Sequence, residues 1–152
     1  MVRREITVEN SIGIEKTLKL MRLIELENIK NHFFIFWVLN KFKNIPLGKI
    51  PFAVWNYVSK NFRYEDDPTD EQLISPKIQI QENIYAGDCD DFALFVKTCL
   101  SVFNIPSSYL LAGDASGFSH ILVILNDGTL LDGTNNKFNF LDQKKYTHLQ
   151  KV

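Results

Sequence analysis

The sequence predicts an α+β fold, in which N-terminal helices and a central buried helix bearing a cysteine pack on a small antiparallel sheet. Helical periodicity dominates the earlier part of the 152-residue chain, and strand-like apolar segments follow it. The tripeptide Asn126-Asp127-Gly128 separates the last two of these segments and is a strong hairpin signal. Helices followed by an antiparallel sheet are typical of the α+β class.

Three helices are predicted in the N-terminal part of the chain. Apolar residues recur every three to four positions from Ser11 to about Asn31, with charged residues between them. The aromatic-rich stretch Phe33–Leu39 predicts a second helix that ends by Asn44-Ile45-Pro46, because a proline and the residue before it disfavour helix. A third helix is predicted from Pro51 to near Asn61. The aromatic rings are expected to pack in the core, with docking to a partner or a membrane surface as the alternative.

A polar region separates these helices from the central one. Tyr64–Glu71 is acidic and is interpreted as a solvated loop, since its carboxylates fit no calcium-loop spacing. A polar connector, residues 75–83, then leads to a Gly-Asp turn. Asp88 is a good N-cap, Asp91 is its acidic partner, and the apolar helix that follows ends at Asn104-Ile105-Pro106. Its apolar residues exceed one face, which predicts burial at the domain centre.

Three strands are predicted after this helix: residues 108–112, 120–125 and 129–132. The last two form the predicted hairpin. If Leu125 pairs with Leu130, Val123 lies opposite Asp132.

Cys89 is the candidate nucleophile, because it stands where the central helix begins. A helix N-terminus and a nearby imidazolium both lower a thiol pKa, and we expect them to outweigh the neighbouring carboxylates. His120 begins the second strand, so its ring can project from the sheet toward the cysteine as a base. Asp132, across the hairpin, can accept a hydrogen bond from that ring and fix its tautomer. Cys89, His120 and Asp132 therefore supply the groups that a nucleophilic cysteine enzyme needs.

Each of these residues also has a purely structural interpretation. A cysteine that opens a buried helix can simply be packing, a histidine at a strand start is usually half-exposed, and Asp-Gly-Thr is usually a turn. Zinc binding is disfavoured, because the three histidines and two distant thiols lack paired-ligand spacing. A non-enzymatic virion or assembly module, docking through its aromatic helices, is the alternative function.

Composition bounds the remaining possibilities. The chain is 45% apolar with a formal net charge of −1, so one domain is expected and no global field favours nucleic acid or an anionic membrane. Ten residues along one helix separate Cys89 from Cys99 by about 15 Å, which predicts free thiols in a reducing compartment. The N-terminus lacks the apolar core of a secretory signal, and the longest apolar run is too short to span a bilayer. A soluble cytoplasmic protein, virion-associated if phage-encoded, is expected.

Several motifs together resemble the transglutaminase-like cysteine-enzyme superfamily, in particular its short single-domain bacterial and phage members. The match extends from about Ser11 to Asn139. The motifs are Val58–Tyr64 (VSKNFRY), Asp67-Pro68, Gly87–Leu94 (GDCDDFAL), Phe103–Pro106 (FNIP), Ser119-His120-Ile121 and Leu131–Thr134 (LDGT). The chain departs from the family at Asn104, where a glycine is more usual, and at Ile121 and Leu122, where relatives often carry an aromatic residue.

The resemblance implies a papain-like core that uses no metal or cofactor. Residues 1–152 would form a single transglutaminase-like domain, with an N-terminal helical segment at 1–46 and a catalytic core at 47–140. Cys89 would attack a carboxamide of a protein or peptide, His120 would move the proton, Asp132 would orient the ring, and water or an amine would resolve the acyl-enzyme. Peptidases, deamidases and crosslinking acyltransferases all belong to this superfamily. By analogy with papain-like enzymes Asn83 is the expected side-chain donor to the oxyanion, with Gln81, or neither side chain, as the alternative. The backbone amide of Cys89 is a further candidate donor.

Overall fold

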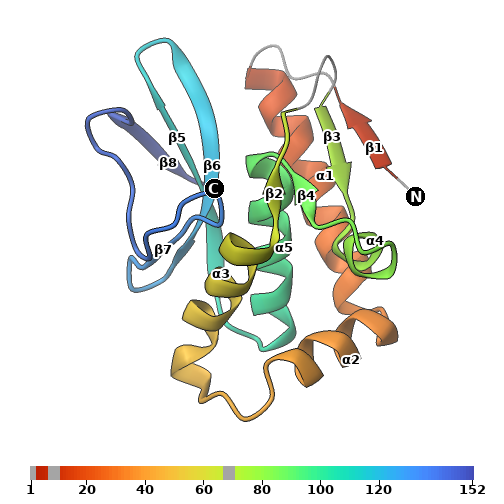
Figure 1. Cartoon of the computed structure of the whole chain (residues 1–152). Helices are drawn as coiled ribbons and strands as arrows, with labels where there is room; N and C mark the ends of the chain where they lie inside the picture. Colours follow the sequence, from red (N-terminus) through yellow and green to blue (C-terminus); the bar gives the residue numbers. More distant parts are fainter. Residues whose placement is uncertain (1–2, 7–10, 67–70) are drawn as a thin grey trace.

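A layer of helices lies beside an antiparallel sheet (Figure 1) in the computed structural model, which describes residues 3–6, 11–66 and 71–152. The predicted α+β class is confirmed. The helices are α1 (Ser11–Ile29), α2 (His32–Lys41), the 3-10 turn η1 (Leu47–Lys49), α3 (Ile50–Asn61), α4 (Pro76–Gln81) and α5 (Cys89–Val102). The main sheet has the order β7-β6-β5-β8 and comprises β5 (Ser107–Asp114), β6 (Gly117–Leu125), β7 (Leu130–Leu131) and β8 (His148–Lys151).

Local sequence accounts for where the N-terminal helices begin and end. The side chain of Asn31 accepts a hydrogen bond from the amide of Phe34 at 3.0 Å and caps α2. Pro51 lies in the first turn of α3, where its missing N–H costs no helical hydrogen bond. The three predicted helices are therefore confirmed to within a few residues.

Helix α5 forms the centre of the core, as its apolar composition predicts. It contacts α1, α2 and α3 as well as β5 and β6. The ring of Phe95 is fully buried and meets Phe34, Trp37 and Phe62 edge-on, at centroid distances of 6.4, 6.0 and 4.8 Å. Such edge-to-face pairs add stability beyond the burial of their area. Phe34 and Trp37 of the predicted second helix thus pack in the core, whereas the side chain of Phe36 is 71% exposed.

The β6–β7 hairpin has a register that differs by one residue from the predicted one. Ile124, rather than Leu125, pairs with Leu130, because the amide of Leu125 donates to the carbonyl of Thr129 and leaves a three-residue loop. Strand side chains alternate between faces, so a one-residue shift changes the face on which each partner lies. The shift brings Asp132 onto the side of the sheet that carries His120.

Several strands were absent from the sequence prediction. The C-terminal strand β8 pairs with β5, and β1 (Arg3–Ile6) pairs antiparallel with β3 (Glu71–Ile74). β2 (Arg63–Tyr64) pairs parallel with β4 (Ala86–Gly87) and approaches the start of α5. Part of the predicted acidic loop, including the motif Asp67-Pro68, lies outside the described residues.

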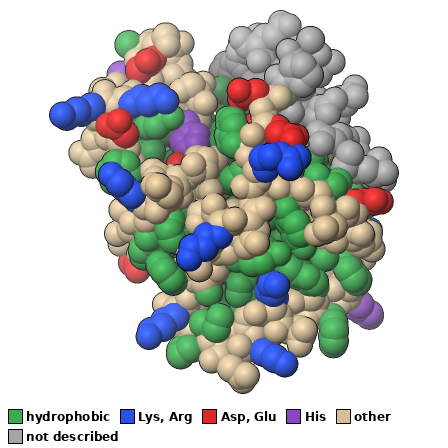
Figure 2. All heavy atoms as spheres, in the orientation of Figure 1, with side chains coloured by type: hydrophobic (Ala, Val, Ile, Leu, Met, Phe, Trp, Pro, Cys, Tyr) green, Lys and Arg blue, Asp and Glu red, His purple; other side chains and the backbone are tan. Residues whose placement is uncertain are grey.

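Hydrophobic side chains gather on the surface over α2 and α3 (Figure 2). Phe36 and Leu39 on α2, Leu47 in η1 and Phe52 on α3 are all exposed. Within the described part of the chain, no helix combines the length and apolar character needed to cross a membrane.

Candidate active site

Cys89 is the first residue of α5, and a tight turn places it there. Gly87 has a φ of +153°, which disfavours any residue with a side chain. A Cβ at this position would also collide with the carboxyl of Asp91. Glycine at position 87 therefore lets the chain turn directly from β4 into α5 and present the thiol at the helix start.

The helix start is fixed by the capping box that the sequence predicts. The side chain of Asp88 accepts from the amide of Asp90 at 3.2 Å, and the carboxyl of Asp91 accepts from the amide of Asp88 at 3.2 Å. The same Asp91 carboxyl also accepts from the amide of Ile74 at 2.8 Å. Asp91 is only 1% exposed, so this buried carboxyl ties β3 to the helix that carries Cys89.

His120, on β6, and Asp132, directly after β7, form a buried pair. Nε2 of His120 lies 2.7 Å from Oδ2 of Asp132, and the side chains are 10% and 6% exposed. A carboxylate only accepts hydrogen bonds, so Nε2 carries the proton of this bond. In the neutral ring Nδ1 is then free to accept a proton, which is the tautomer a general base requires.

Hydrogen bonds from Thr134 and Trp55 hold Asp132 in place, and a ring contact with Tyr146 holds His120. Its Oδ1 accepts from the amide of Thr134 at 3.0 Å and from the Thr134 hydroxyl at 2.6 Å. Its backbone carbonyl accepts from Nε1 of Trp55 at 2.8 Å, which links the site to α3. The ring of Tyr146 stacks on the ring of His120, with centroids 5.4 Å apart and planes inclined by 19°. The side chains of Thr134, Trp55 and Tyr146 were not predicted from the sequence to belong to the site.

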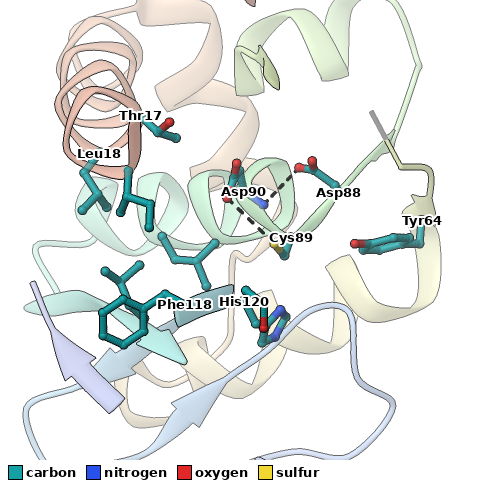
Figure 3. Close-up of a pocket in the computed structure, with 12 residues that line it drawn as sticks. Thr17, Leu18, Tyr64, Asp88, Cys89, Asp90, Phe118 and His120 are labelled. Atoms are coloured by element: carbon teal, nitrogen blue, oxygen red, sulfur yellow. Dashed lines mark hydrogen bonds between the residues drawn. The ribbon is translucent and has the colours of Figure 1, made fainter. Parts of the chain in front are cut away.

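Cys89 and His120 line one cavity of about 220 Å³ (Figure 3). The thiol comes from the helical layer and the imidazole from the sheet, as the sequence predicts. The backbone amide of Ile121, on β6, is close enough to the sulfur to lower the pKa of the thiol. In Figure 3 the hydroxyl of Tyr64 points toward Cys89 from the side opposite to Leu18 and Phe118. Burial, followed by the proximity of Cys89 and of Asp66, raises the pKa of Tyr64, so this hydroxyl keeps its proton and can donate.

The pKa of the Cys89 thiol is raised, contrary to the prediction from its helix position. Burial, followed by the negative charge of Asp88, raises it from 9.0 to about 12. The amide of Ile121 opposes both effects but does not overcome them. The thiol proton is directed toward Oδ1 of Asp90, 3.8 Å from the sulfur. Cys89 is therefore a neutral thiol at rest.

The other candidate residues lie apart from this cavity. Asn83, the expected oxyanion donor, is exposed in the turn after α4 with a φ of +52°, and Gln81 is exposed at the end of α4. Gln79 is fully buried, but it exchanges two hydrogen bonds with the backbone of Ala86 and so holds β4 in place. Cys99 is a buried free thiol in the core, and Cys89 is also free, as predicted.

Metal-binding side chains do not cluster in the described ranges. Among the residues in those ranges, no three His, Cys, Asp or Glu side chains converge in a way that could hold an ion.

The fold is similar to that of several solved structures. Calcium-bound LapG of Legionella pneumophila superposes with a TM-score of 0.56 and 20% identity, over 91% of this chain and 81% of LapG. The chain shares the fold of LapG. The EGTA-treated form of the same protein gives a TM-score of 0.58 at 20% identity, over 90% of this chain and 79% of LapG. No protein-family model and no curated protein sequence matches the chain.

A second fold neighbour comes from Cytophaga hutchinsonii and is described as a "Putative Cysteine Protease". It superposes with a TM-score of 0.52 and 18% identity, over 88% of this chain and 42% of its own length. The α+β arrangement around α5 therefore recurs in proteins that share little sequence with this chain.

Proposed function

We propose that the protein is a cysteine hydrolase that cleaves peptide or side-chain amide bonds, with Cys89 as nucleophile, His120 as general base and Asp132 as the residue that orients His120. The observation that carries this proposal is the buried His120–Asp132 pair, 2.7 Å apart, whose imidazole lines the same cavity as the helix-borne thiol. The fold shared with a protein described as a cysteine protease supports it.

The raised thiol pKa determines how the first step proceeds. Because Cys89 rests as a thiol, Nδ1 of His120 takes the proton as the sulfur attacks the amide carbonyl. A C–S bond forms, and the negative charge moves to the carbonyl oxygen. The Cys89 amide and the Tyr64 hydroxyl are the donors we assign to that oxygen. The imidazolium then protonates the leaving amine as the C–N bond breaks.

Water completes the reaction. His120, again neutral, removes a proton from a water molecule that attacks the thioester carbonyl, and the C–S bond breaks to return the thiol and a carboxylic acid. An amine acceptor in place of water would make the protein an acyltransferase. We propose hydrolysis, because water can reach the acyl-enzyme without a binding site of its own.

Two measurements on the whole chain test the proposal. p-Nitrophenyl acetate should release one rapid equivalent of p-nitrophenolate and leave an acetyl group on Cys89, detected by mass spectrometry of the digested protein. A mixture of peptides of diverse sequence should yield new termini, or mass changes that report deamidation. Both activities should disappear in Cys89→Ala and persist in Cys99→Ala. An unmodified Cys89 and an unchanged peptide mixture would overturn the assignment.

A further inference from the structure

The cavity beside Cys89 has an apolar wall on one side and the hydroxyl-bearing Tyr64 on the other. Its apolar wall consists of Ile14 and Leu18 on α1, Leu111 on β5, and Phe118 and Ile121 on β6. The thiol and the imidazole lie between this wall and Tyr64. Figure 3 shows Leu18 and Phe118 on one side of Cys89 and Tyr64 on the other. Any group bound against the apolar wall is therefore held next to the reacting sulfur.

The size of the cavity limits what can occupy it. Its volume of about 220 Å³ is below the roughly 300 to 1,000 Å³ of pockets that enclose a whole small ligand. A single side chain is a suitable occupant, with the rest of the substrate outside. The wall is formed in part by α1, so the N-terminal helix contributes to the cavity as well as to the core.

The charges around the cavity restrict its occupant further. Asp88 and Asp90 are the charged carboxylates that line it, and no Lys or Arg side chain of the described residues does so. A carboxylate on the substrate would be repelled there, since like charges in a partly buried site interact strongly. A lysine side chain would gain charge attraction but would place its polar end against the apolar wall, at a desolvation cost.

We infer that this cavity is the specificity subsite of the proposed hydrolase and accepts an apolar side chain of the residue whose carbonyl Cys89 attacks. The inference rests on the proposed function, because it takes Cys89 as the nucleophile. Ile14, Leu18 and Phe118 are the residues that set the preference, and they come from two elements that meet only in the folded chain. The preferred substrate is a peptide with a leucine-like residue on the acyl side of the cleaved bond.

A series of p-nitrophenyl esters of N-acetyl-leucine, N-acetyl-alanine, N-acetyl-aspartate and N-acetyl-lysine tests the preference directly. In each case the Cys89 C–S bond forms, the ester C–O bond breaks, and the thiol proton passes through His120 to solvent. Rates are divided by those of the same esters with N-acetylcysteine, which removes differences in intrinsic reactivity. The leucine ester should react about tenfold or more faster than each of the others. Equal rates, or a faster aspartate or lysine ester, would overturn the subsite.

Variants of the apolar wall provide the second arm. Phe118→Ser and Ile14→Ser change half-buried residues on different elements, and each should reduce the leucine-to-alanine rate ratio about fivefold or more. Phe36→Ser, at a position on α2 that is 71% exposed, is the matched control and should leave the ratio unchanged. If one wall variant does not fold, the other variant and the wild-type series still decide the question.

The two proposals fail in different ways. Acetylation of Cys89 by p-nitrophenyl acetate without any preference for leucine overturns the subsite and leaves the hydrolase intact. Failure of every ester to acylate Cys89 overturns the hydrolase, and the subsite with it.

Discussion

In His120→Ala the rate of Cys89 acylation should depend on the fraction of Cys89 present as thiolate, and therefore on the thiol pKa. With a pKa of about 12 instead of 9.0, the thiolate fraction near neutral pH is roughly a thousandfold smaller than for an ordinary thiol. In the proposed mechanism wild-type protein avoids this penalty, because His120 would remove the proton during attack. We therefore expect His120→Ala to acylate about 10² to 10⁴ times more slowly at neutral pH.

The sign of the pH dependence follows from the direction of the shift. A raised thiol pKa favours the protonated form, so the thiolate of the variant accumulates only as the pH rises toward 12. Its rate should increase about tenfold per unit between roughly pH 7 and pH 10. Wild-type protein should show a shallower rise, since it does not depend on preformed thiolate.

The assay is the release of p-nitrophenolate from p-nitrophenyl acetate, followed by stopped flow at each pH and corrected with Cys89→Ala. His32→Ala is the control, because His32 is an exposed histidine at the start of α2. Circular dichroism confirms that each variant is folded. A His120→Ala protein with the wild-type rate, or the two proteins with parallel pH profiles, would refute the role of His120 as the base.

Three further predictions concern the residues that support the site. Asp132→Asn should lower the acylation rate about 10²-fold or more. An amide nitrogen facing Nε2 of His120 selects the tautomer with its proton on Nδ1, and that tautomer cannot take the thiol proton there. A decrease below threefold in the same burst assay would argue against the orienting role of Asp132. Gly87→Ala should lower the free energy of unfolding, measured in urea, by about 1 to 3 kcal/mol, since φ is +153° and the new Cβ meets the Asp91 carboxyl. Gly48→Ala is the control and should lower that free energy far less, because there is open space around Gly48. Equal losses in the two variants would contradict this account. Burial raises the pKa of Asp91, so its contribution to stability is complete below about pH 3.9 and is lost as the pH rises through the pKa of the folded state. Relative to Asp91→Asn, the free energy of unfolding of wild-type protein should fall by up to about 1.4 kcal/mol per pH unit over that range. If the free energies of the two proteins, measured in urea, vary with pH in parallel, this contribution is excluded.

Local signals in the sequence predicted much of the structure around Cys89. Asp88 and Asp91 have the spacing of a capping box, and the structure contains both hydrogen bonds of that motif. Asn126-Asp127-Gly128 predicted a turn between two strands, and the hairpin is present. These features depend on residues only a few positions apart, so their geometry is encoded locally.

Features that depend on tertiary packing were not predictable in the same way. The register error at Leu130 arose because loop length, rather than turn composition, decides which residues pair. The pKa of Cys89 was predicted in the wrong direction, because burial of its thiol is the largest effect and exists only in the folded chain. Tyr146 stacks on His120 from 26 residues downstream, and no spacing rule connects the two.

If Cys89 and His120 react as proposed, their separation between two layers makes turnover sensitive to how those layers dock. The thiol is fixed to α5 by its capping box, and the imidazole is fixed to the sheet by Asp132, so the packing of α5 against the sheet sets their spacing. A small slide of the helix across the strand would leave every secondary-structure element intact and still abolish proton transfer. The rate of the proposed hydrolase would thus detect loosening of this interface before spectroscopic signs of unfolding emerge.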